Sequence, residues 1–211
     1  MVEPNNLFLK VGEKGLRATF ANAYTQSYLD SLAVGKRRPS VTTCAVSAAG
    51  LRFRDLQDLE HDRAVSWDIL RDRFSENVGR ELPPVTASQA GQHLAGVARH
   101  HDLTIYETFI TDMAGHGRLG FTTVQAVARI DGLVEGVLGR MNRSTTLLMT
   151  SDHGNLEDSR HRRHTRNPVP LLAVGPLAGR FADVSSILGV TPRILDCLGA
   201  RGKTSMTSIG A

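Results

Sequence analysis

Short apolar runs in the second half of the chain predict the strands of a sheet. Residues 103–110 (LTIYETFI) and 145–150 (TTLLMT) combine apolar, β-branched and aromatic side chains over strand-like lengths. Each run leads into an aspartate, Asp112 and Asp152 respectively. A third run, residues 169–174 (VPLLAV), is closed by a Gly-Pro pair. The runs therefore predict three strands, with a carboxylate just beyond the carboxyl ends of the first two.

The segments between these strands have the periodicity of amphipathic helices. Between residues 122 and 141, apolar side chains recur at intervals of three and four residues, which predicts one buried helical face. The residues of this predicted face are Val124, Val127, Ile130, Val134, Val137, Leu138 and Met141. Residues 88–101 predict an earlier helix. Strand, helix and strand in this order imply a right-handed parallel crossover, so the predicted fold is α/β with a mostly parallel sheet flanked by helices on both faces.

The pattern is weaker elsewhere in the chain. Residues 16–23 predict an early strand and residues 190–198 a closing helix. Between residues 37 and 84 the pattern is irregular, with a strand predicted at 41–46 and a helix at 66–74.

Length and composition narrow the class of protein. A chain of 211 residues is long enough for one sizeable core, so we predict a single domain over residues 1–211. Charged residues make up 22% and hydrophobic residues 41% of the chain, as in ordinary globular proteins. Cys44 and Cys197 lie far apart, which predicts no disulfide framework. Without an apolar run of membrane-spanning length or a secretory leader, the sequence predicts a cytoplasmic protein with no membrane partner.

The charge pattern allows two kinds of phosphate-containing partner. The formal net charge is +4, and the basic stretch 159–166 contains Arg160, Arg162, Arg163 and Arg166. Arginines in such a loop can hold phosphate in bidentate fashion, or they can form a nucleic-acid patch. Aromatic residues are only 5% of the chain, which leaves little for base stacking, so nucleic acid is the less favoured partner.

Two Asp/His pairs follow the predicted strands. His116 lies four residues after Asp112, and His153 is adjacent to Asp152 and precedes Gly154. Carboxylate and imidazole together are typical ligands of Mn²⁺ and Zn²⁺, whereas Ca²⁺ sites are built from oxygen. The alternative, non-functional interpretation is that the two Asp/His pairs arise by chance and that the aspartates only cap helices.

Three ordered motifs resemble a known family. Residues 112–116 (DMAGH), 151–155 (SDHGN) and 164–170 (HTRNPVP) resemble the C-terminal metal-binding segments of the cofactor-independent phosphoglycerate mutases, within the alkaline phosphatase superfamily. The resemblance implies an alkaline phosphatase-like fold, two divalent metal ions (Mn²⁺ or Zn²⁺), phosphoryl transfer of the phosphomutase or phosphatase type and a small phosphorylated substrate.

The resemblance also implies ligand sets. The first metal would be held by Asp112, His116 and His164, and the second by Asp152 and His153. Lys14 is similar in position to a phosphate-contacting lysine of the family, although a solvated lysine is the plainer interpretation. Arg166 is the second candidate for contact with the substrate.

The sequence departs from the family pattern at its beginning. The family needs an Asp-Gly motif on its first strand and a Ser or Thr nucleophile, and neither motif is visible here. We expect the chain to be the C-terminal part of a longer enzyme, incomplete at the N-terminus and inactive alone; a non-catalytic metal-binding scaffold of the same fold is the alternative. Residues 37–84 would be a small insertion or a remnant of the family's cap domain.

Overall fold

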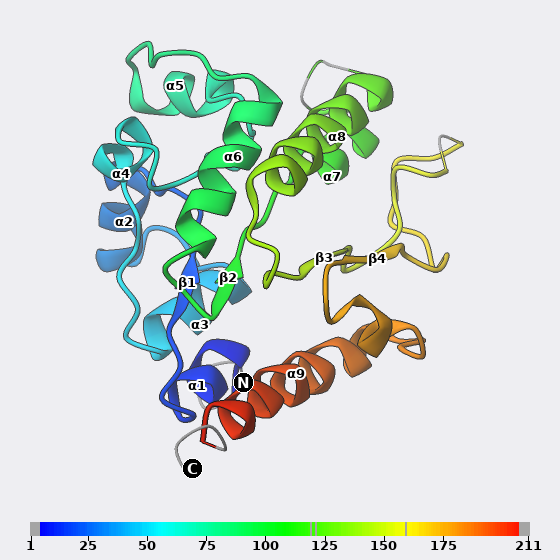
Figure 1. Cartoon of the computed structure of the whole chain (residues 1–211). Coiled ribbons are helices and arrows are strands. Elements are labelled where there is room, and N and C mark those ends of the chain that lie inside the picture. Colours follow the sequence, from blue (N-terminus) through cyan, green and yellow to red (C-terminus); the bar gives the residue numbers. More distant parts are fainter. Residues whose placement is uncertain (1–4, 119, 121, 159, 207–211) are drawn as a thin grey trace.

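The regular structure of the described chain is mostly helical, with four short strands placed between the helices (Figure 1). The computed structural model describes residues 5–118, 120, 122–158 and 160–206. The helices are α1 (Leu7–Gly12), α2 (Gln26–Ala33), α3 (Val41–Ala48), α4 (Leu56–Glu60), α5 (Asp72–Val78), α6 (Ala87–Ala98), α7 (Ile110–Gly115), α8 (Thr123–Arg140) and α9 (Val190–Met206). The strands are β1 (Ala18–Phe20), β2 (Leu103–Ile105), β3 (Leu147–Thr150) and β4 (Leu171–Val174), and the 3₁₀ helices are η1 (Ala178–Phe181) and η2 (Ile187–Gly189). Within this described part, no helix has both the length and the apolar character needed to cross a bilayer.

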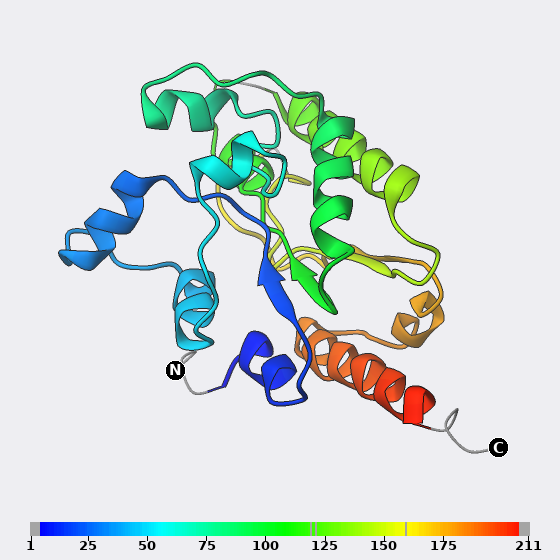
Figure 2. The ribbon, with the colours of Figure 1, turned by 60° about the vertical axis from the view of Figure 1, so that its left-hand side comes forward.

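The strands form two separate pairs in the part of the chain that the structure describes. β1 lies parallel to β2, with Ala18 opposite Leu103 (Figure 2). β3 lies antiparallel to β4, with Leu147 opposite Val174. The mixture of helices and strands agrees with the predicted α/β class, but one mostly parallel sheet is not confirmed. The order of elements does not determine which strands pair, and the loop between β3 and β4 reverses the chain without a crossover helix.

Helices α6 and α8 pack with their backbones in close contact. Each begins with a capping box, Thr86 with Gln89 in α6 and Thr122 with Gln125 in α8. A Cβ on Gly91 would lie only 2.0 Å from the carbonyl oxygen of Leu133. The two helices can approach this closely only because Gly91 has no side chain.

The buried face of α8 differs from the prediction. Ala126, Leu133, Gly136 and Val137 are its buried residues. Val124, Val127 and Leu138 were predicted to be buried but are 76%, 49% and 39% exposed. A Cβ on Gly136 would lie 1.9 Å from the carbonyl oxygen of Ser88, so α8 turns its glycine side toward α6. The hydrophobic pattern misses this face because glycine contributes no apolar side chain.

The main core joins segments that are distant in sequence. Its buried residues are Val65, Ile69, Ala90, Ile110 and Leu133. Two further buried clusters lie around Phe74 and Leu59, and around Phe8 and Phe20. Because Ile110 begins α7, the main core supports the helix that contains Asp112.

Two predictions for residues 37–84 were wrong in detail. Residues 41–46 are helical, and the Ser40 hydroxyl oxygen accepts a hydrogen bond of 3.1 Å from the amide of Thr43 at the start of α3. A short apolar run does not distinguish a strand from a buried helix. The helix predicted at 66–74 begins only at Asp72, because Ile69 and Arg71 have positive φ angles of 71° and 72°.

Residues 37–84 share their cores with the rest of the chain. The amide of Val65 donates to the carbonyl of Ala21 (2.9 Å), and the amide of Ala23 donates to the carbonyl of Val65 (3.0 Å). Phe74 and Leu59 are buried with Ala23 in one cluster. The interpretation of this stretch as an insertion or cap remnant stays a prediction.

Candidate metal centre

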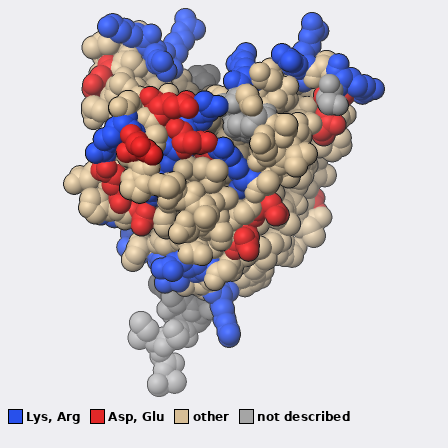
Figure 3. All heavy atoms as spheres, turned by 90° about the horizontal axis from the view of Figure 1, so that it is seen from above, with Lys and Arg blue, Asp and Glu red and all other residues tan. Residues whose placement is uncertain are grey.

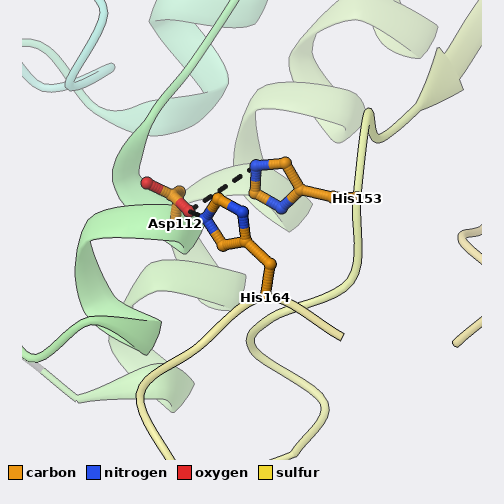
Figure 4. A group of neighbouring side chains, drawn as sticks. All are labelled: Asp112, His153 and His164. Carbon is orange, nitrogen blue, oxygen red and sulfur yellow. Dashed lines mark ion pairs between the residues drawn. The ribbon is translucent and has the colours of Figure 1, made fainter. Parts of the chain in front are cut away.

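Three segments of the chain bring a carboxylate and three imidazoles together. Asp112 lies in the first turn of α7 and His116 ends that helix. His153 follows β3, and His164 lies further along the loop toward β4. Figure 4 shows the rings of His153 and His164 side by side, both directed at the Asp112 carboxylate. Four of the five predicted metal ligands therefore meet at one place.

The donor atoms converge on one carboxylate oxygen. Asp112 Oδ1 lies 3.3 Å from His116 Nε2 and 3.2 Å from His164 Nε2. The two imidazole nitrogens are themselves 3.1 Å apart. Ligand atoms that share a divalent ion at about 2.1 Å lie roughly 3 to 3.5 Å from one another. The spacing of these three atoms therefore fits one ion.

His153 completes a wider group. Its Nε2 is 3.8 Å from Asp112 Oδ1, and one ligand atom each from Asp112, His153 and His164 all lie within 4.8 Å of one another. The same Nε2 is 3.6 Å from Asp152 Oδ1. His153 thus lies between the first predicted ligand set and Asp152, whose side chain is 81% exposed.

The tautomer of His116 suits a metal ligand. Its Nδ1 lies 2.7 Å from the backbone carbonyl oxygen of Arg162. A carbonyl oxygen only accepts, so Nδ1 must donate, and Nε2 in the neutral ring keeps a lone pair toward Asp112 and His164. Such an outer hydrogen bond orients the ligand ring.

Buried polar atoms beside the ligands are short of partners. Among the described residues, neither His153 Nδ1 nor Asn155 Oδ1, both of which are buried, has a hydrogen-bond partner. Asn155 Nδ2 lies 3.4 Å from both Asp112 Oδ1 and His116 Nε2. A Cβ on Gly115 would lie 1.6 Å from Asn155 Oδ1, so only glycine leaves room for this amide. Together with the donor set, these atoms fit a site for a divalent ion.

No role was predicted for Asn155. The residue belongs to the 151–155 motif, but periodicity and ligand chemistry single out only its acidic and histidine neighbours. It is only 5% exposed, which is unusual for an amide side chain. The one sequence signal for Asn155 is its position directly after the Asp-His-Gly turn.

The predicted substrate residues lie in different settings. Arg166 is exposed two residues beyond His164. Lys14 is exposed between α1 and β1, with Nζ 3.8 Å from the position that a Cβ of Gly199 in α9 would take. In the view from above, Lys and Arg side chains project in separate groups with Asp and Glu between them (Figure 3). On the described residues of that face, the basic side chains thus form separate groups and not one continuous stripe.

Comparison with known proteins defines the class. Residues 82–201 match the Metalloenzyme superfamily, and this match covers more than half of the 211 residues, so the chain belongs to that superfamily. All five predicted metal ligands lie inside the matched segment.

The similar curated proteins are phosphoglycerate mutases. The chain is 33% identical over 136 residues to the 2,3-bisphosphoglycerate-independent phosphoglycerate mutase of Desulforudis audaxviator, with 59% of this chain and 26% of that protein covered. It is 31% identical over 134 residues to the enzyme of the same name from Acaryochloris marina, with 55% and 25% covered. The chain thus matches about a quarter of the length of these relatives. No solved structure matches the chain. The predicted family resemblance is confirmed.

Proposed function

We propose that this chain contains the metal-binding part of a phosphoryl-transfer protein of the phosphomutase or phosphatase type. Asp112, His116 and His164 would hold one divalent ion, Mn²⁺ or Zn²⁺, and Asp152 and His153 would contribute to a second. The observation that supports the proposal best is the convergence of Asp112 Oδ1, His116 Nε2 and His164 Nε2 at separations of 3.1–3.3 Å.

The bound ions would supply positive charge that stabilises the oxygens of a transferring phosphoryl group and favours the ionised form of a nucleophile. The protein's own part is to hold the donors in place and to guide the substrate. Arg166 is exposed close to His164 in sequence and can contact a phosphate of a small substrate in bidentate fashion. Lys14 is the weaker candidate, because its side chain lies beside α9.

The hydroxyl groups that flank the ligand histidines already have acceptors. Ser151 Oγ donates to the carbonyl oxygen of His153 at 2.9 Å, and Thr165 Oγ1 donates to the carboxylate of Glu157. A hydroxyl held in this way is poorly placed to attack phosphorus. This supports the prediction that the nucleophile lies outside these segments, and we expect the chain to bind metal without turnover of its own.

Thermal unfolding with added metal tests the proposal. At about 100 times the Kd, Mn²⁺ or Zn²⁺ should raise the Tm by roughly 5–10 °C. His164→Ala should abolish this increase, because it removes a donor from the tight group. His100→Ala is the matched control, since His100 is exposed at the end of α6 and distant from the donors in sequence. If neither metal raises the Tm of the unaltered chain, the metal proposal fails.

A non-catalytic metal-binding scaffold is the second candidate, and the engaged hydroxyls of Ser151 and Thr165 favour it. The coding sequence upstream of Met1 separates the two candidates. An in-frame apolar strand that ends in Asp-Gly, followed by a small-residue loop with Ser or Thr, supports the enzyme. An upstream stop codon without such a segment supports the scaffold.

A further inference from the structure

The loop between β3 and β4 must hold two ligand histidines without the help of a core. Side-chain exposure is 28% for His153 and 50% for His164. The two rings are nevertheless stacked, with centroids 3.6 Å apart and planes at 16°. One isolated bridge, Gly154 to Thr165, joins the two sides of the loop, with the amide of Thr165 donating to the carbonyl of Gly154 at 2.8 Å. A single bridge is too little to keep two such sides together in water.

Glu157 links the same two sides. Its Oε2 accepts a hydrogen bond of 2.7 Å from the backbone amide of Asn155, on the side that contains His153. Its Oε1 accepts from Asn167 Nδ2 at 3.0 Å and from the Thr165 hydroxyl, on the side that contains His164. One carboxylate therefore receives three donors from residues that lie one to three positions from the histidines. Hydrogen bonds to an ionised acceptor are the stronger kind.

The backbone is shaped around this carboxylate. A Cβ on Gly154 would lie 2.2 Å from Thr165 Oγ1 and 2.6 Å from Glu157 Oε1. Glycine at this position is therefore what lets Glu157 and Thr165 reach each other beside the ligand segment. The hydrogen bond from Thr165, with those from the backbone and from Asn167, lowers the pKa of Glu157 to about 2, so the acceptor is ionised at neutral pH.

We propose that Glu157 is a positioning residue, which holds the His153 and His164 segments of the loop at the separation that metal binding needs. The proposal rests on the metal-binding function proposed above. Glu157 lies outside the proposed ligand sets. It acts through Asn155 and Thr165, and its removal should loosen the loop and lower metal affinity while leaving the fold intact.

The test compares carboxylates within one loop. Glu157→Gln keeps the size of the side chain but replaces one carboxylate oxygen with an NH₂ group, which cannot accept a hydrogen bond. At least one of the three hydrogen bonds is therefore lost, and with it the link to one side of the loop. Asp158→Asn is the matched control, because the Asp158 carboxylate pairs with Arg160 at 2.6 Å and lies 3.7 Å from His161 Nε2. Among the described residues it accepts no hydrogen bond from Asn155, Thr165 or Asn167, the three donors that Glu157 joins. Thr165→Val is the second variant, and it removes one donor while it leaves Glu157 charged.

Calorimetric titration with Mn²⁺ and with Zn²⁺ provides the first readout. We expect Kd to rise 10- to 100-fold in Glu157→Gln, somewhat less in Thr165→Val, and less than twofold in Asp158→Asn. The metal-free Tm of all three variants should equal that of the unaltered chain. Equal metal affinity in Glu157→Gln and the unaltered chain overturns the proposal, and so does an equal loss in Asp158→Asn.

Proton NMR of the metal-free protein separates this proposal from the proposed function. In the unaltered chain, nuclear Overhauser contacts should join the ring protons of His153 and His164, and Glu157→Gln should weaken them. Contacts that persist in the variant overturn the positioning role even if the metal binds. If the contacts are lost but no metal binds to any form, Glu157 positions the loop and the metal function alone fails.

Discussion

Two parts of the molecule are stabilised in different ways. The α6–α8 half surrounds the main core of Val65, Ile69, Ala90, Ile110 and Leu133, and the β3–β4 half comprises residues 147–174. Helices α6 and α8 meet at backbone distance over a core that includes the buried side chains of Leu133 and Ile110. In the described residues of 147–174, by contrast, only Gly154 and Asn155 are buried. The first half is held by apolar burial. The second is held by hydrogen bonds around a candidate metal centre, so we expect the two halves to respond to different changes.

The largest effect should come from the helix contact. Gly136→Leu places a side chain where a Cβ already lies 1.9 Å from the carbonyl oxygen of Ser88. The backbones must separate, and we expect the free energy of unfolding to fall by at least about 3 kcal/mol. Chemical denaturation measures this change.

Gly139→Ala is the control for this prediction. Nothing lies within 4 Å of a Cβ at Gly139, which is in the same helix. Alanine is the better helix former, so this variant should gain up to about 1 kcal/mol. Similar destabilisation by both variants would show that the close approach at Gly136 has no special role.

The second effect separates the two halves directly. At about 100 times Kd, a bound metal stabilises by roughly 2.7 kcal/mol those states that keep the site intact. If the β3–β4 half opens on its own, Mn²⁺ should increase hydrogen-exchange protection at residues 151–167 and leave α6 unchanged. Protection that rises equally in α6 would mean that the two halves unfold together.

The sequence predicted which side chains lie together at the candidate centre better than it predicted the sheet. The two Asp/His pairs indicated Asp112, His116 and His153, and the family resemblance added His164, because ligand chemistry restricts which residue types can serve. These four side chains lie together, and their role as metal ligands stays a prediction. The pairing of β2 with β1 and of β3 with β4 was not predictable from local patterns, since strand runs of similar composition do not specify their partners. The roles of Asn155 and Glu157 also depend on contacts across a loop, which the linear pattern does not record.

The third effect concerns a carboxylate buried in the first half. Asp68 is fully buried, and its Oδ2 accepts hydrogen bonds from the amides of Arg73 (2.6 Å) and Phe74 (3.2 Å), while Oδ1 has no hydrogen-bond partner among the described residues. Burial, followed by the neighbouring Asp72, raises the pKa of Asp68 to about 6. The folded state therefore binds the proton more tightly than the unfolded state, and stability falls as pH rises through the interval between the unfolded and folded pKa values.

Asp68→Asn should remove this dependence. The variant should gain stability relative to the unaltered chain between about pH 4.5 and about pH 8, by roughly 2 kcal/mol. Denaturant midpoints at the two pH values measure the gain. Asp58→Asn is the contrast, because burial raises the pKa of Asp58 but the bonds from Arg52, the Asp55 backbone and Arg63 outweigh it and lower the pKa overall. A lowered pKa makes the contribution of Asp58 to stability fall off only below its ordinary pKa of about 3.9, so the stability of Asp58→Asn relative to the unaltered chain should stay nearly constant between these two pH values. An equal gain in both variants would contradict the assignment to Asp68.

The smallest effect tests which face of α8 is buried. Val124 is 76% exposed, so Val124→Ala loses little apolar contact and gains helix propensity, and stability should stay within about 0.5 kcal/mol of the unaltered chain. Leu133 is only 6% exposed in the main core, and Leu133→Ala should cost about 2–5 kcal/mol. The hydrophobic pattern treats Val124 as a core position. If Val124→Ala lowers the free energy of unfolding by more than about 1 kcal/mol, Val124 is buried, as the hydrophobic pattern predicts. Another surface would then have to cover this part of α8.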